Sequence, residues 1–121
     1  MKKLIALLMA SAFMFVFAAM TFAMPKAPAK VTISDIQKRK PAVTFSHEMH
    51  AKKFGCKECH HKWKGGDAVP EKCSKCHGKK KEGKKPKLKN AFHKKCKGCH
   101  KAMKKEGKPT GPTSCKGCHK K

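Results

Sequence analysis

Apolar positions are concentrated at the start of the chain and are scattered after it. A continuous uncharged run extends from Leu4 to Phe22. Beyond it, Val31–Ile33 and Pro41–Phe45 favour short extended segments, which could pair as a small ribbon. Helices are expected over His47–Lys53 and over Asn90–Lys105. The pattern predicts a small domain that is mostly irregular and α-helical, with little strand.

Breaker residues separate these elements. Ser46 is a plausible N-cap for the first helix. Gly65-Gly66 and Pro70 predict a loop, and Gly107–Thr113, with two prolines, predicts a turn. The lysine-rich segment Lys79–Lys89 is interpreted as a solvated linker. No leucine heptad or long alternating strand is present.

The apolar start of the chain is interpreted as a secretory signal. Lys2 and Lys3 precede the run, and Thr21-Phe22-Ala23 is an acceptable cleavage site. An uncleaved membrane anchor is the alternative, because the run is near spanning length. We favour cleavage, since the lysine- and proline-containing segment that follows is typical of a mature secreted domain. Residues 1–23 would then be removed on export, leaving residues 24–121 in the periplasm as one domain without stable membrane insertion.

The mature chain has too few large apolar side chains to build its own core. Leu, Ile, Val and Phe together number nine among its 98 residues, or about a tenth. Highly charged chains below roughly one fifth are expected to be disordered. Another source of apolar mass must therefore be present.

A repeated motif supplies that source. C-x-x-C-H is the attachment sequence for c-type haem, in which two thiols form thioethers and the following histidine faces the iron. It occurs four times and accounts for all eight cysteines: Cys56, Cys59 and His60; Cys73, Cys76 and His77; Cys96, Cys99 and His100; Cys115, Cys118 and His119. Four haem c groups would form the core of a haem-packed domain.

The histidine count matches two axial ligands for each haem. Four histidines belong to the motifs, and the four others are His47, His50, His61 and His93. His47 and His50 lie three residues apart on the expected helix, so each is interpreted as the distal ligand of a different haem. His60 and His61 are neighbours that must serve different haems. Compact packing with short electron transfers follows.

Two imidazoles on each iron imply electron carriage. Neutral imidazoles favour ferric haem more than a His/Met pair does, so low reduction potentials are expected. A saturated iron has no open position for a substrate, which argues against an enzyme. An outer-sphere multihaem reductase of metal ions or oxyanions is the alternative.

The cysteines have two alternative interpretations. Paired C-x-x-C units with histidines are also zinc ligands, but zinc does not require a histidine after the second cysteine in all four units. Disulfides within each C-x-x-C would leave the histidines and the missing core unexplained.

Charge points to an acidic partner. Without the two signal lysines, 29 basic residues face seven acidic ones, a net charge of +22. Eight haem propionates would offset part of it. Such a field favours fast, salt-sensitive encounter with acidic proteins. Nucleic acid is a poor candidate partner for an exported protein. The alternative is that the lysines only maintain solubility.

The sequence resembles the cytochrome c3 family of class III multihaem cytochromes from about Val43 to the C-terminus. Val43-Thr44-Phe45-Ser46-His47-Glu48-Met49-His50 is similar to its V-x-F-x-H-x-x-H opening, and Cys59-His60-His61 to its C-H-H. Two residues between the cysteines of every unit, and Gly111-Pro112-Thr113, resemble the three-haem c7 relatives. Those relatives lack the second haem, whose residues are all present here.

The resemblance implies a set of four distal ligands. His47 would serve the first haem with His60, His61 the second with His77, His50 the third with His100, and His93 the fourth with His119. It also implies a periplasmic shuttle from hydrogenase to membrane-associated multihaem cytochromes in sulfate or sulfur respiration. We expect a monomer. Docking would use lysines around the fourth haem; the candidates are Lys94, Lys95, Lys97, Lys101, Lys104, Lys116, Lys120 and Lys121.

Overall fold

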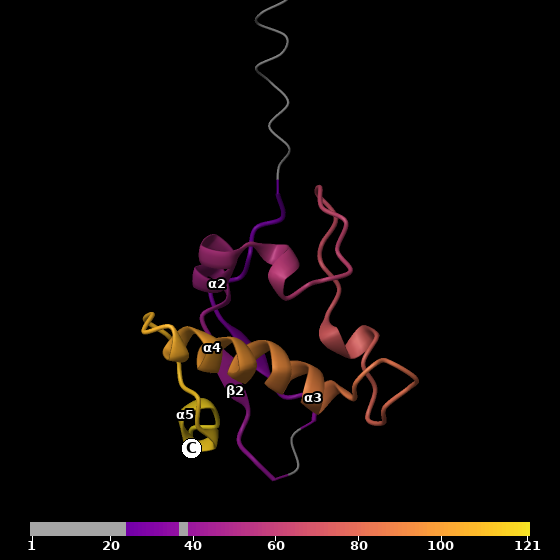
Figure 1. Ribbon diagram of the computed structural model, residues 1–121. Coiled ribbons are helices and arrows are strands. Elements are labelled where there is room, and N and C mark those ends of the chain that lie inside the picture. Colours follow the sequence, from indigo (N-terminus) through magenta and orange to yellow (C-terminus); the bar gives the residue numbers. More distant parts are fainter. Residues whose placement is uncertain (1–23, 37–38) are drawn as a thin grey trace, which may run out of the picture.

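The computed structural model describes residues 24–36 and 39–121 (Figure 1). The predicted signal segment, residues 1–23, lies outside this part of the chain. Within it, regular structure is confined to short helices and one two-stranded sheet, joined by irregular segments. The predicted fold class, small and mostly irregular with helices and little strand, is confirmed.

The predicted ribbon is formed by β1 (Val31–Ile33) and β2 (Val43–Phe45), which pair antiparallel. Thr32 and Thr44 are opposite each other, and their hydroxyl oxygens are 2.9 Å apart on the exposed side. The apolar residues that flank them are half-buried, because successive side chains of a strand point to opposite faces. The ribbon therefore directs one apolar face toward the rest of the chain.

Helix α2 (His47–Phe54) follows β2 directly and ends one residue later than expected. Ser46 is its N-cap residue, but the hydroxyl makes no capping hydrogen bond. The Ser46 carbonyl is used instead. It accepts the backbone N–H of His50 at 3.3 Å and the ring Nδ1–H of the same residue at 2.7 Å. The start of α2 thus orients an imidazole.

A long helical segment occupies the second half of the chain (Figure 1). It consists of α3 (Leu88–His93), a π-helical stretch η4 (Lys94–Gly98) and α4 (Cys99–Lys105). The expected helix began at Asn90; the observed one begins two residues earlier. Gly107, with a φ of 70°, ends it in a Schellman motif, in which Lys108 N–H bonds the Met103 carbonyl at 2.9 Å.

The remaining elements are single helical turns. They are η2 (Cys56–Glu58), η3 (Cys73–Lys75) and α5 (Cys115–Cys118). The predicted loop at Gly65-Gly66 is closed by the indole of Trp63, which donates to the Ala68 carbonyl at 2.7 Å. No helix in the described residues is long and apolar enough to cross a membrane.

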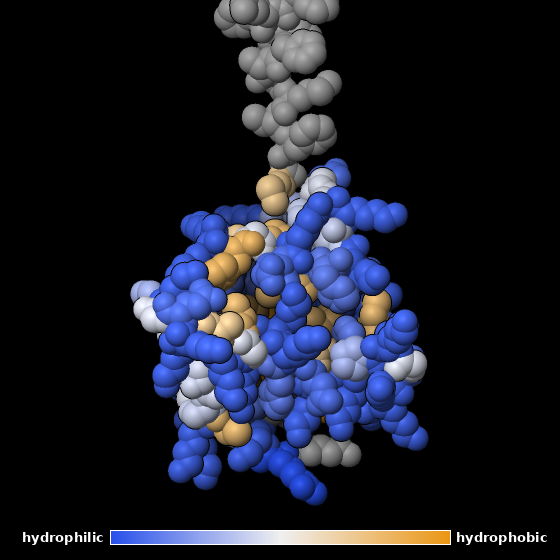
Figure 2. Space-filling view, viewed as in Figure 1, coloured by the Kyte–Doolittle hydropathy of each residue, from blue (hydrophilic) through white to orange (hydrophobic). Residues whose placement is uncertain are grey.

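The described residues contain a single buried hydrophobic side chain, Leu88, which is 5% exposed. In Figure 2 the visible face is covered by hydrophilic residues, with apolar ones only in small patches between them. The described part of the polypeptide therefore forms no continuous core of its own, in agreement with its composition.

We predict that the chain produced without haem attachment will show no cooperative thermal unfolding. Burying one leucine contributes roughly 1.5–3 kcal/mol, against about 1–2 kcal/mol of backbone entropy for each ordered residue. Circular dichroism during heating would measure this, with protein from a haem-attaching host as the control. A sharp transition in the haem-free chain would contradict the prediction.

Candidate haem-binding site

Each C-x-x-C-H unit is built on one helical turn. In the first, second and fourth units the histidine N–H bonds the carbonyl of the first cysteine, at 2.9, 2.9 and 2.8 Å. The third unit lies where η4 continues into α4. Residues three apart in a helical turn lie on the same side. Both thiols of a unit are therefore placed on one side, as attachment to a single ring requires.

The cysteines are free thiols in all four units. Among residues 24–36 and 39–121, no three His, Cys, Asp or Glu side chains are grouped so that they could hold a metal ion. The four-donor arrangement of a structural zinc site is thus not formed by the described cysteines and histidines. The thiols also do not pair as disulfides.

Thiols from different units lie close enough to influence one another. Burial, followed by the charges of Cys59, Cys73 and Cys118, raises the pKa of Cys96 to about 11. Burial is also the main cause of the raised pKa of Cys59 and Cys73. The Cys96 residue is exposed to solvent, but the protein atoms around its thiol still disfavour the charged thiolate form. Cysteines of different attachment units therefore lie near one another in the fold.

The four motif histidines share one hydrogen-bonding arrangement. Each ring bonds a backbone carbonyl through Nδ1: His60 to Glu71 at 3.0 Å, His77 to Pro86 at 2.8 Å, His100 to Pro112 at 2.8 Å and His119 to Pro41 at 2.7 Å. A carbonyl can only accept, so Nδ1 carries the proton and Nε2 keeps its lone pair. This is the tautomer and the support that metal-binding histidines require.

Three motif histidines each lie opposite another histidine. The ring centroids are 6.1 Å apart for His47 and His60, 6.1 Å for His61 and His77, and 6.3 Å for His50 and His100. Two imidazoles on opposite sides of one metal, with bonds of about 2 Å, have centroids roughly 6 Å apart. These separations fit an iron between the rings. The three pairs are those implied by the resemblance.

The fourth predicted pair is linked electrostatically. Burial lowers the pKa of His93, and the charges of Lys89 and then His119 lower it further. His93 and His119 therefore lie within range of each other, although no ring contact joins them. The His119 ring is held by the carbonyl of Pro41, which lies two residues before β2 and 78 positions away in the sequence.

Helix α2 connects two of the pairs. His47 and His50 both contact the edge of the Phe45 ring, with centroid separations of 5.8 and 5.5 Å. His60 and His61 belong to two pairs as well. Successive sites are therefore joined through one helix and one dipeptide. The Nδ1 of His47 is buried and has no hydrogen-bond partner.

Sequence reasoning did not identify the groups that support the imidazoles. Three of the four carbonyl partners belong to prolines, and the sequence gave no signal that these carbonyls bond the histidine rings. It also missed the ion pair between Lys95 and Glu58, 3.2 Å apart, which joins the first unit to the helix of the third. Both side chains are half-exposed, so this pair contributes at most about 1 kcal/mol.

Gly111 is a further supporting residue, and we predict that Gly111→Ala will displace the His100 ring. A Cβ there would lie 2.6 Å from Cε1 of His100 and 3.1 Å from both ring nitrogens. Such overpacking costs typically about 1–3 kcal/mol. The electron paramagnetic resonance spectrum of the oxidised holoprotein should then change for one low-spin haem.

Gly78→Ala is the matched control. Gly78 follows a motif histidine, but its Cβ would meet only Oε1 of Glu82 at 3.7 Å, an ordinary contact. Identical spectra for the Gly111 variant and the wild type would contradict the role given to Gly111.

The sequence is similar to that of known proteins. A model of the class III cytochrome c family matches residues 20–119. A cytochrome c3 from Desulfovibrio desulfuricans is 45% identical over 53 residues, 43% of this chain and 46% of that protein, so the chain spans under half of that relative's length.

Solved structures agree with the sequence match. A di-tetrahaem cytochrome c3 from Desulfovibrio gigas is 33% identical with a TM-score of 0.61, over 78% of this chain and 97% of that one. A sixteen-haem cytochrome from the same organism is 30% identical with a TM-score of 0.56, over 92% and 26%. With its haem-attachment units and its facing imidazoles, the chain belongs to the class III cytochrome c family.

Proposed function

We propose that this protein is a periplasmic electron carrier that holds four haem c groups, each between two histidines. The family supports a cytochrome c3-type multihaem electron carrier. The observation that carries the finer proposal is the set of three imidazole pairs at 6.1–6.3 Å, each with a carbonyl-bonded motif histidine. Four units with two thiols each would attach one haem apiece.

The residues that would hold each haem follow from these positions. The thiols of each unit would form the two thioethers, and the motif histidine would be the proximal ligand. His47, His61, His50 and His93 would be the distal ligands of the first, second, third and fourth haem. When bound, haem iron supplies reversible one-electron transfer. The chain holds the motif imidazole of each pair by a carbonyl hydrogen bond, so oxidation and reduction would need little movement of that ring.

Low reduction potentials are part of the proposal. Two imidazoles favour ferric iron more than an imidazole and a thioether do. The carbonyls that accept from Nδ1–H make the motif imidazoles more basic and increase this preference. Because both axial positions are filled by the chain, electron carriage is favoured over catalysis at iron.

We further propose export with removal of residues 1–23, and function as a monomer. Acidic redox proteins, such as periplasmic hydrogenase and membrane-associated multihaem cytochromes, would be the partners in sulfate or sulfur respiration. The eight candidate lysines, which lie in η4, α4 and α5 and at the C-terminus, would form the docking face around the fourth haem; the C-terminal ones, Lys120 and Lys121, are exposed. Opposite charge would orient the partner and raise the rate of encounter.

Intact mass tests the number of haems and the start of the mature chain. Protein from a periplasmic, haem-attaching host should begin at Met24 and carry four haem masses, with low-spin c-type absorption bands. Replacing Cys73 and Cys76 by alanine should remove one haem mass and leave three. A wild-type mass with three haems, or an unchanged mass in the variant, would contradict the proposal for the second unit.

Salt dependence tests the docking face. We predict that the second-order rate of reduction by a periplasmic hydrogenase will fall steeply as ionic strength rises, because screening shortens the range of the lysine field to about 8 Å at 0.15 M. Stopped-flow absorbance of haem reduction would measure it. A neutral small-molecule reductant is the control, since its rate should stay nearly constant. A hydrogenase rate independent of salt would rule out steering by lysines.

A further inference from the structure

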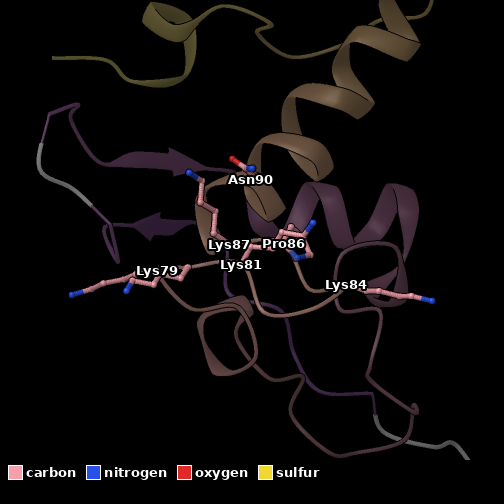
Figure 3. A pocket seen from close by; sticks show the side chains of 7 residues that line it. Lys79, Lys81, Lys84, Pro86, Lys87 and Asn90 are labelled. Carbon is pink, nitrogen blue, oxygen red and sulfur yellow. The ribbon is translucent and has the colours of Figure 1, made fainter.

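A second concentration of lysines lies outside the fourth unit, on the loop that precedes α3. A shallow pocket there is lined by five lysines together with Pro86 and Asn90 (Figure 3); the lysines are Lys79, Lys80, Lys81, Lys84 and Lys87. All five are exposed. The sequence predicted only a solvated linker in this segment. The structure instead places its lysines around a common surface, here termed the loop surface.

The charge of the loop surface is not neutralised within the described chain. Residues 79–89 contain seven lysines and one acidic residue, Glu82. The ion pairs of the described residues join Lys52 to Glu48, Lys95 to Glu58 and Lys108 to Glu106, so none involves this loop. The loop surface therefore presents a strong, uncompensated positive field to solvent.

The loop is held in a defined shape. Glu82 and Lys85 exchange backbone hydrogen bonds of 3.1 and 2.8 Å around a turn at Gly83, whose φ is 54°. The Leu88 N–H then bonds the Gly78 carbonyl at 2.8 Å, and the buried Leu88 side chain anchors the end of the loop. These bonds fix the backbone that carries the lysines.

The loop surface is connected to the second haem-binding unit through one hydrogen bond. Pro86, which lines the pocket, offers its carbonyl to Nδ1–H of His77 at 2.8 Å. The ring of His77 faces His61 with a centroid separation of 6.1 Å. A molecule on the loop surface would therefore lie against the backbone that supports the axial ligand of the second haem.

This surface is separate from the lysines of the fourth unit. Figure 1 shows the loop before α3 at one side of the molecule and α5 with the C-terminus at the other, with the α3–α4 helix between them. A partner that covers one of these surfaces would leave the other accessible.

We infer that the loop surface is a second docking site, for an acidic protein that exchanges electrons with the second haem. The inference rests on the proposed function. In Figure 3 the side chains of Lys79 and Lys84 point in opposite directions, so one small anion could not contact both. A protein surface with several carboxylates could. Among polyanions, only a redox protein would gain from binding beside a haem ligand, because only a redox protein exchanges electrons with the haem.

The test uses the tetrahaem holoprotein with poly-L-glutamate as an acidic probe. Haem methyl resonances would be followed by NMR during the titration. We expect those of the second haem and those of the fourth haem to shift with separate binding curves. The triple substitution Lys79→Glu, Lys81→Glu and Lys84→Glu should weaken the binding seen at the second haem at least about tenfold, because like charges would then face each other.

The matched control reverses three lysines at the other surface: Lys101→Glu, Lys104→Glu and Lys120→Glu. It should weaken binding at the fourth haem and spare the second. Equal losses at both haems in both variants would overturn the inference, because only overall charge would then matter. Unchanged binding with a shifted potential of the second haem would also overturn it, since the lysines would then serve that haem's propionates.

Further results would distinguish failure of the docking site from failure of the proposed function. Tighter binding of a DNA oligonucleotide of equal charge at the loop surface would contradict an acidic protein as the partner. A holoprotein that lacks the second haem by mass would contradict the proposed function. By contrast, a four-haem protein whose second-haem resonances never shift would contradict only the second docking site.

Discussion

The arrangement of this protein depends on pairs of imidazoles from different parts of the chain. The two rings of each pair face each other at a separation that fits one metal ion between them. The polypeptide has no continuous apolar core in its described part, and its elements are too short to be stable alone. Facing rings at 6.1–6.3 Å nevertheless join α2, the first two attachment units and the α3–α4 helix. Haem between the rings would supply both the missing bonds and the missing apolar area, so folding and cofactor binding would be one process.

Backbone carbonyls, rather than side chains, hold the motif imidazoles in place. Each Nδ1–H is bonded within 2.7–3.0 Å, and three of the four acceptors are proline carbonyls. Proline restricts the backbone at these acceptors, since its ring fixes φ. The rings are therefore oriented by segments that have no regular secondary structure but whose backbone is restricted by proline. The π-helical stretch before Cys99 places the third unit inside a helix, whereas the other units end short turns.

The sequence was sufficient wherever the signal was local. The attachment motif, the alternating residues of the ribbon and the start of α2 after Ser46 each depend on a few neighbouring positions. These elements were found close to their predicted bounds. The supporting contacts were not predictable in this way. Pro41 lies 78 positions from His119, and only the fold brings them together. Gly111 is required because of the ring of His100, which no local pattern reveals. The π-helical stretch and the helix start at Leu88 likewise depend on packing rather than on propensity.

The separation between supporting carbonyls and surface side chains accounts for the lysine-rich surface. Because carbonyls position the axial rings and the thiols would fix the porphyrins, few surface side chains are needed for the architecture. The ion pairs in the described chain are half-exposed and contribute little to stability. Many surface positions can therefore be occupied by lysine without loss of the fold. Repulsion between the positive charges limits their number, and haem propionates would partly relieve that repulsion. Under the proposed function, partner recognition would vary through the placement of lysines alone, while the imidazole pairs that hold the haems would remain unchanged.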